Sequence, residues 1–287
     1  MGLITSILFP VDFSPSCIAM APYVKRAATL FDAKVSLIHV FDPASYNGFE
    51  LYLRRAPEIA GEHQTIGRNR INSFLRTEFP ISERPRILVA GDAATEIAVA
   101  ARSGFDLTIM PTHAGTFRRM LLGSTTAKVL NDADCPVLTS RHAETIAPRP
   151  LGHREWLCTI GLGEDSERVL RYAHQAAAKA RGNLQIIHAV QTTDPDFPVQ
   201  LELEEQIQFD EIQKAGQRIA DLQRSVGSNA PVRIVAGPVK EALLEAARRF
   251  DADALIIGRS PQSGAHGRIR DLTYAIVRDS PFPVLSV

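Results

Sequence analysis

An internal repeat is the feature that most constrains the fold of this chain. The segment FDLTIMP at 105–111 returns as ADALIIG at 252–258, 147 residues later. LIHVF at 37–41 returns as IIHAV at 186–190, 149 residues later. Because these echoes follow the same order in both halves, the chain is a duplication, and each half is expected to form the same structural unit.

Length and composition allow two globular units. The chain has 287 residues, about twice the size of an average domain, and its 45% hydrophobic content lets each half bury a core of its own. A polar, proline-containing stretch separates the two copies. We therefore predict a first domain over 1–141, a linker over 142–154 and a second domain over 155–287.

Short apolar runs alternate with helical periodicity in both halves. The first half predicts strands near 4–11, 34–41, 86–90, 106–110 and 136–140, and helices near 15–31, 58–79, 93–103 and 124–132. The second half predicts strands near 156–161, 184–190, 231–235, 253–257 and 283–287, and helices near 166–181, 200–226, 238–249 and 271–279. Strands that are apolar without alternation are typical of parallel sheets covered on both faces. The predicted fold class is α/β, with two tandem doubly wound, Rossmann-like, five-stranded parallel sheets.

Charge and cysteine usage exclude several classes of partner. The 32 basic residues balance the 32 acidic ones, so no global field favours nucleic acid or an anionic membrane. Cys17, Cys135 and Cys158 form no C-x-x-C pair and suggest neither a disulfide framework nor a zinc site. No run of 18 apolar residues occurs, and no secretory signal is recognisable. We expect a cytoplasmic protein without bound metal in its structure.

Residues that directly follow the strands are the candidates for a binding site, because ligands of open α/β sheets bind at the carboxyl ends of the strands. Asp12 follows the first strand and Gly91 the third. The segment 111–125 follows the fourth and ends in Gly123-Ser124-Thr125, which opens a helix. Free backbone N–H groups and hydroxyls at that point predict an anion cradle, with Arg118 and Arg119 nearby.

Each of these residues also has a structural interpretation that the sequence leaves open. Asp12 is compatible with a turn or cap, and Gly123-Ser124 with a plain helix N-cap, which uses the same donors as a phosphate site. His39 and His188 occupy equivalent positions in apolar strands, and we expect them to be partly buried structural residues. His113 has no neighbouring metal ligand at suitable spacing, so we expect it to serve loop structure.

Several motifs occur together and in a characteristic order: LFPVDFS at 8–14, THAG at 112–115, LLGS at 121–124 and CPVL at 135–138. In this combination the chain resembles the universal stress protein family along nearly its whole length, twice. The resemblance implies five-stranded parallel sheets, paired as tandem pseudo-dimers or as homodimers. It also implies an adenine nucleotide ligand, ATP or AMP, and allows Mg²⁺ with ATP.

The same resemblance assigns roles to individual residues of the first copy. It implies that Asp12 meets the adenine or ribose, that the main chain near Val40 recognises the adenine edge and that Gly91 borders the ribose. The phosphates would be held by three consecutive residues of the helix start: Gly123, Ser124 and Thr125.

The phosphate loop departs from the family pattern G-x2-G-x9-G-[ST]. Pro111 and Ala114 replace the first two glycines, and eight residues separate Ala114 from Gly123. In the second copy, Gly161 stands in place of Asp12, Pro261 aligns with Ala114, and Arg270-Asp271-Leu272 replaces the Gly-Ser-Thr triplet. We predict that Asp271 caps its helix and repels a phosphate, so that the second copy is structural or binds something different.

These observations favour a stress-response protein that binds an adenine nucleotide in its first domain, with the second domain as its partner. The alternative is a family member that binds no nucleotide and acts as a scaffold or interaction module, a function that Pro111, Ala114 and the short loop favour. We do not expect an enzyme, because FSPSC at 13–17 lacks the S-G-G-x-D-S loop of related adenylating enzymes.

Overall fold

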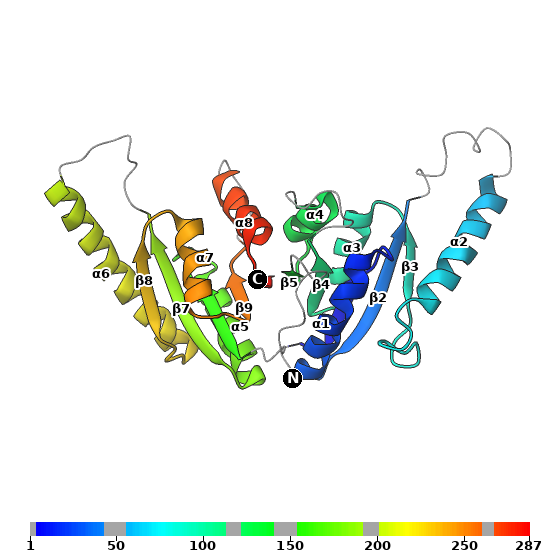
Figure 1. Ribbon diagram of the computed structural model, residues 1–287, viewed down its shortest axis with the longest axis horizontal. Helices are drawn as coiled ribbons and strands as arrows, with labels where there is room; N and C mark the ends of the chain where they lie inside the picture. The colour runs from blue at the N-terminus through cyan, green and yellow to red at the C-terminus, as the bar shows by residue number, and fades with distance from the viewer. Residues whose placement is uncertain (1–3, 43–55, 113–121, 141–153, 192–200, 260–266) are drawn as a thin grey trace. The chain divides into compact units, whose positions relative to one another are not determined.

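A computed structural model shows an α/β protein whose chain divides into two compact units, Met1–Leu151 and Gly152–Val287 (Figure 1). The structure describes residues 4–42, 56–112, 122–140, 154–191, 201–259 and 267–287. Within these ranges, no helix has both the length and the apolar character needed to cross a membrane.

The first unit is a parallel sheet with the strand order β3-β2-β1-β4-β5. Its strands are β1 (Ser6–Pro10), β2 (Lys34–Phe41), β3 (Ile87–Ala90), β4 (Leu107–Pro111) and β5 (Val137–Ser140). Its helices are α1 (Pro15–Phe31), α2 (Ala56–Ser73), α3 (Ala93–Arg102) and α4 (Ser124–Asp132).

The second unit repeats this topology with the order β8-β7-β6-β9-β10. Its strands are β6 (Glu155–Thr159), β7 (Asn183–Val190), β8 (Val232–Ala236), β9 (Ala254–Ile257) and β10 (Val284–Ser286). Its helices are α5 (Ser166–Ala180), α6 (Leu201–Val226), α7 (Val239–Arg249) and α8 (Gly267–Asp279). The predicted fold class, a doubly wound parallel sheet in each half, is confirmed.

The central strands form the core of each sheet. All five residues of β1 and all four residues of β9 are buried, as expected where helices cover both faces of a sheet. Right-handed crossovers send α1 and α2 to one face and α3 and α4 to the other, and α3 packs against α4. In each unit the strand order reverses beside the first strand, which leaves a crevice at the carboxyl ends of the strands.

Helix α1 forms as its sequence predicts. Ser14 is the N-cap and its side chain accepts a hydrogen bond from the Cys17 N–H, while Pro15 occupies the first helical position. The predicted apolar face is confirmed, because Met20, Val24, Ala27 and Phe31 are all buried. This cap fixes the start of α1 directly after the loop that follows β1.

Two predicted helix boundaries were wrong. Helix α2 ends at Ser73 rather than near residue 79, because the chain turns at Leu75, whose φ is 48°, and returns Phe79 to the core. The Phe79 ring packs edge-on against Phe9 of β1 at 6.0 Å. Helix α8 begins at Gly267, four residues before Asp271, so Asp271 lies inside the helix and the prediction that it is the N-cap was wrong.

The two equivalent histidines are structural, as predicted. His39 Nδ1 lies 2.8 Å from the Val11 carbonyl oxygen, and His188 Nδ1 lies 2.7 Å from that of Ile160. A carbonyl oxygen only accepts, so Nδ1 donates in both cases. Each imidazole thus satisfies a carbonyl group of the residue that follows the first strand of its unit. Both rings are partly buried.

A pH dependence of stability follows from His39. Burial lowers the pKa of His39, an effect larger than the opposing one of the hydrogen bond to Val11. As the pH falls, His39 in the unfolded chain therefore binds a proton near the ordinary histidine pKa, whereas His39 in the folded chain binds it only at lower pH. The contribution of His39 to the free energy of unfolding is present above pH about 6.5 and is lost as the pH falls below that value.

Urea denaturation of the wild type and of His39→Asn at several pH values measures this contribution. Asparagine is a neutral donor, so we expect the wild type to lose more stability than the variant between neutral and mildly acidic pH. Parallel pH profiles for the two proteins would contradict the assignment.

Candidate functional site

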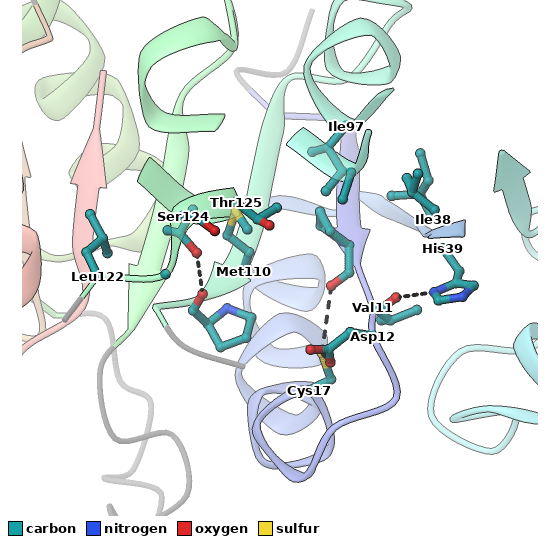
Figure 2. Close-up of a pocket in the computed structure, with 16 residues that line it drawn as sticks. Val11, Asp12, Cys17, Ile38, His39, Ile97, Met110, Leu122, Ser124 and Thr125 are labelled. Carbon is teal, nitrogen blue, oxygen red and sulfur yellow. Dashed lines mark hydrogen bonds between the residues drawn. The ribbon is translucent and has the colours of Figure 1, made fainter. Parts of the chain in front are cut away.

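A cavity of about 370 Å³ lies at the carboxyl ends of the strands of the first unit (Figure 2). Its volume is in the range of small-molecule sites. The lining comes from the end of β1, from β2, from the end of β4 and from the starts of α1, α3 and α4. The residues are Pro10, Val11, Asp12, Cys17, Ile38, His39, Val40, Ala93, Ile97, Met110, Pro111, Leu122, Gly123, Ser124, Thr125 and Thr126. The cavity therefore lies at the point where the strand order reverses.

Asp12 occupies the rim of the cavity with half of its carboxylate engaged. Its Oδ1 accepts hydrogen bonds from the Ser14 N–H at 2.9 Å and from the Cys17 thiol at 3.1 Å. Its Oδ2 has no hydrogen-bond partner among the described residues. The side chain is exposed, so Oδ2 is available to accept a hydroxyl or amino group of a ligand.

The amino end of α4 faces the same cavity. Its N-cap is Gly123, which offers no side chain to cap the helix, and the first turn contains no acidic residue. The N–H groups of the first turn are therefore not occupied by a capping side chain. The Thr126 hydroxyl donates a hydrogen bond to the Pro111 carbonyl oxygen at 3.2 Å. Ser124 is exposed at the helix start.

Helix α4 therefore offers an anion the positive end of its dipole, free amides and the Ser124 and Thr125 hydroxyls. None of the described lining residues is lysine or arginine, and Asp12 is the acidic one. An anionic group would thus be held by neutral donors at α4, away from the carboxylate at the end of β1.

Strand β2 supplies the remaining wall. Val40 lines the cavity and pairs in register with Val89 of β3. The His39 side chain also lines it, but its Nδ1 is committed to the Val11 carbonyl. The imidazole thus stabilises the end of β1 instead of offering Nδ1 to a ligand.

Gly91 stands apart from the other predicted site residues. It is not among the described residues that line the cavity, whereas Ala93 is. Its N–H donates to the Phe41 carbonyl at 3.0 Å, its φ is 150°, and an added Cβ would lie 2.9 Å from Glu96 Oε1. Gly91 therefore has a conformational role in the turn after β3. Its contact with a ribose stays a prediction.

The corresponding region of the second unit has different chemistry. Gly161 follows β6 where Asp12 follows β1. A Cβ on Gly258, the residue after β9, would lie 2.5 Å from Asp165 Oδ2, so a carboxylate packs against the end of this strand. Arg168 donates to the carbonyl oxygens of Arg259 and Val287 at 3.2 and 3.3 Å. Asp165 thus places an acidic group near this crevice, and an acidic group disfavours a phosphate. This group is not the predicted one, Asp271, and its position does not depend on the predicted Asp271 cap.

Some predicted residues lie outside the described residues: His113, Ala114, Arg118, Arg119 and Pro261, and the side chains of Arg270 and Asp271.

The sequence analysis did not predict one residue that the structure places in the cavity, Cys17. The signal was present, since Ser14 and Pro15 define the helix start and thereby put Cys17 in the first turn, facing the end of β1.

The environment of Cys17 predicts an unreactive thiol. Burial and the nearby Asp12 carboxylate raise the pKa of Cys17 to about 12, so little thiolate exists at neutral pH.

We expect iodoacetamide at pH 8 to modify Cys17 far more slowly in the native protein than in urea. Mass spectrometry of the Cys17 peptide measures the two rates. Equal rates in the two conditions would contradict this structure of the loop.

Comparisons with known proteins agree with the fold. A model of the universal stress protein family matches residues 4–141 and again 155–287. The universal stress protein Rv2623 of Mycobacterium tuberculosis is 22% identical over 277 residues, which cover 92% of this chain and 89% of that protein.

Solved structures of similar length share the fold. A universal stress protein from Archaeoglobus fulgidus has a TM-score of 0.66 at 20% identity, covering 98% of this chain and 95% of that chain. A functionally unknown protein, PA1789 from Pseudomonas aeruginosa, has a TM-score of 0.64 at 18% identity, covering 99% and 92%. Since the family model matches both halves, the chain belongs to the universal stress protein family and carries two tandem copies of its domain.

Proposed function

We propose that the first domain binds an adenine nucleotide, ATP or AMP, in the cavity between the ends of β1, β2 and β4. The observation that carries this proposal is the amino end of α4, which faces the cavity without a capping side chain. The Asp12 carboxylate, whose negative charge is opposite to the positive end of the α4 dipole, lines the same cavity at the end of β1. The site thus separates donors for a phosphate from an acceptor for hydroxyl or amino groups.

Each part of a nucleotide finds matching groups in this arrangement. The phosphates would accept from the first-turn amides of α4 and from the Ser124 and Thr125 hydroxyls. A ribose hydroxyl would donate to Asp12 Oδ2, and the adenine edge would meet the main chain near Val40 between apolar side chains such as Ile38 and Ile97. Mg²⁺ would arrive with the ATP phosphates, and Asp12 is the single described carboxylate at the cavity.

We propose further that the protein is a binding protein rather than an enzyme. The described polar side chains of the cavity do not form a nucleophile and base pair: the Cys17 thiol is held protonated by its raised pKa, and His39 Nδ1 donates to a backbone carbonyl. A binding role in a cytoplasmic stress response fits this chemistry and the buried cysteines, which form no disulfide. Steady ATP turnover by purified protein would contradict this part.

The second domain is proposed to be mainly the pseudo-dimer partner of the first. Gly161 removes the carboxylate, and Asp165 places a negative charge beside the end of β9. If the two domains stabilise each other, urea unfolding of the full chain gives one cooperative transition. Two separate transitions would show that the domains unfold independently. Whether two chains form a homodimer is a separate question, which sedimentation at several protein concentrations tests.

Titration calorimetry with ATP and AMP tests the site. We expect about one site per chain, and loss of binding in Asp12→Arg, because a long cation fills the rim and removes the acceptor. The matched control is Gly161→Arg in the second domain, where an added Cβ meets no atom within 4 Å. Unchanged ATP affinity in Asp12→Arg, or loss in Gly161→Arg, would remove the assignment.

Two substitutions at Ser124 separate the dipole from the hydroxyl. Ser124→Ala leaves the amides in place and should weaken ATP by a few fold, since one hydrogen bond is lost. Ser124→Asp puts a negative charge at the phosphate position and should weaken ATP by about tenfold or more, although acidic residues suit a helix start. Equal affinities for the two variants would contradict phosphate binding at α4.

A second candidate function is a scaffold that binds no nucleotide. Pro111 favours it, because this residue lines the cavity where the family loop usually has glycine, and proline has no N–H to donate to a phosphate. No rise in melting temperature with millimolar ATP, together with a specific protein partner recovered by pull-down, would select this function.

A further inference from the structure

The loop after β1 contains a residue in an unfavourable backbone conformation. Phe13 has a φ of 64°, in the left-handed region that residues with a Cβ rarely adopt. Leu162 holds the equivalent position of the second unit with a φ of 58°. The turn is therefore a property of the fold in both domains, but only the first domain places a carboxylate, Asp12, directly before it.

The Phe13 ring contacts three other side chains. Its ring centroid lies 4.3 Å from that of His39 on β2 and 5.1 Å from that of Phe74, which it meets edge-on. The Arg70 guanidinium of α2 lies 4.2 Å from the ring centroid, in a cation–π contact. His39 is itself fixed by its hydrogen bond to Val11. These contacts oppose a change of the Phe13 φ from the left-handed region to a more favourable value.

The orientation of Asp12 depends on this turn. The Asp12 carboxylate bonds the Ser14 N–H, two residues on, and the Cys17 thiol beyond it. Both bonds span residue 13, so a change of its φ would move their donors away from Asp12 Oδ1. The carboxylate would then lose the contacts that leave Oδ2 as its free oxygen at the cavity.

We propose that Phe13 is a positioning residue for the nucleotide site: its ring, held by His39, Phe74 and Arg70, keeps residue 13 left-handed and so fixes the Asp12 carboxylate at the cavity rim. The role of Phe13 in binding rests on the proposed function. The structural part of the proposal, that the Phe13 ring holds the loop, is independent of that function.

Two substitutions of Phe13 report on the ring. Phe13→Ala removes the stacking and leaves the backbone strain, so it should release the loop most. Phe13→Leu introduces the residue that the second domain carries at the same turn, so it is compatible with the fold while lacking the aromatic and cation–π contacts. The matched control is Leu162→Ala, which relaxes the equivalent turn without a carboxylate before it.

Alkylation of Cys17 is a readout that needs no ligand. Cys17 is 1% exposed and its thiol bonds Asp12, so release of the loop should expose it. We expect iodoacetamide to modify Cys17 about tenfold faster in Phe13→Ala than in the wild type, less so in Phe13→Leu, and at the wild-type rate in Leu162→Ala. Wild-type rates in both Phe13 variants would overturn the proposal, and so would an equal acceleration in the Leu162 control. If Phe13→Ala does not fold, Phe13→Leu decides alone.

A double-mutant cycle tests the route to the ligand. Phe13→Leu should weaken ATP by several fold in the wild type, yet have little further effect in Asp12→Asn, because Phe13 acts through Asp12. Additive losses would overturn the positioning role. If the wild type itself binds neither ATP nor AMP, the proposed function fails, and the Cys17 alkylation rates still decide whether Phe13 holds the loop.

Discussion

The right-handed crossover between parallel strands is the constraint on which the rest of this structure depends. It sends the first two helices of each unit to one face of the sheet and the next two to the other. The chain must then leave neighbouring strands β1 and β4 in opposite directions, which opens a crevice between their carboxyl ends. Asp12, Ser124 and Thr125 meet at one cavity for this reason, although more than a hundred residues separate Asp12 from the others.

The duplication separates what the fold requires from what a ligand would require. Two structural features recur in both copies: the left-handed backbone of Phe13 and Leu162, and the hydrogen bond from the imidazole of His39 or His188 to a backbone carbonyl. These features stabilise the same turn and strand ends in each unit. The side chain before the turn does not recur, since Asp12 corresponds to Gly161. The two copies thus share an architecture and differ in the charge that they present at the crevice.

The boundaries of most elements followed from local pattern, because buried central strands and amphipathic helices leave a strong periodic signal. The exceptions have tertiary causes. Helix α2 stops at Ser73 because the chain returns Phe79 to Phe9 in the core, a contact that no periodicity in 58–79 reveals. Among the predicted site residues, Gly91 does not line the cavity, because its backbone closes the turn after β3.

The sequence by itself determined the duplication, the order of strands and helices, and the positions where chemistry can occur, since each of these depends on the local succession of apolar, polar and turn-forming residues. Only the tertiary structure decided how the side chains share their partners. It showed that Cys17 and Ser14 occupy one oxygen of Asp12, that Gly123 leaves α4 without a capping side chain, and that Asp165 lies against Gly258. These contacts join residues whose distance depends on packing in three dimensions and on rotamers, which a linear pattern does not encode.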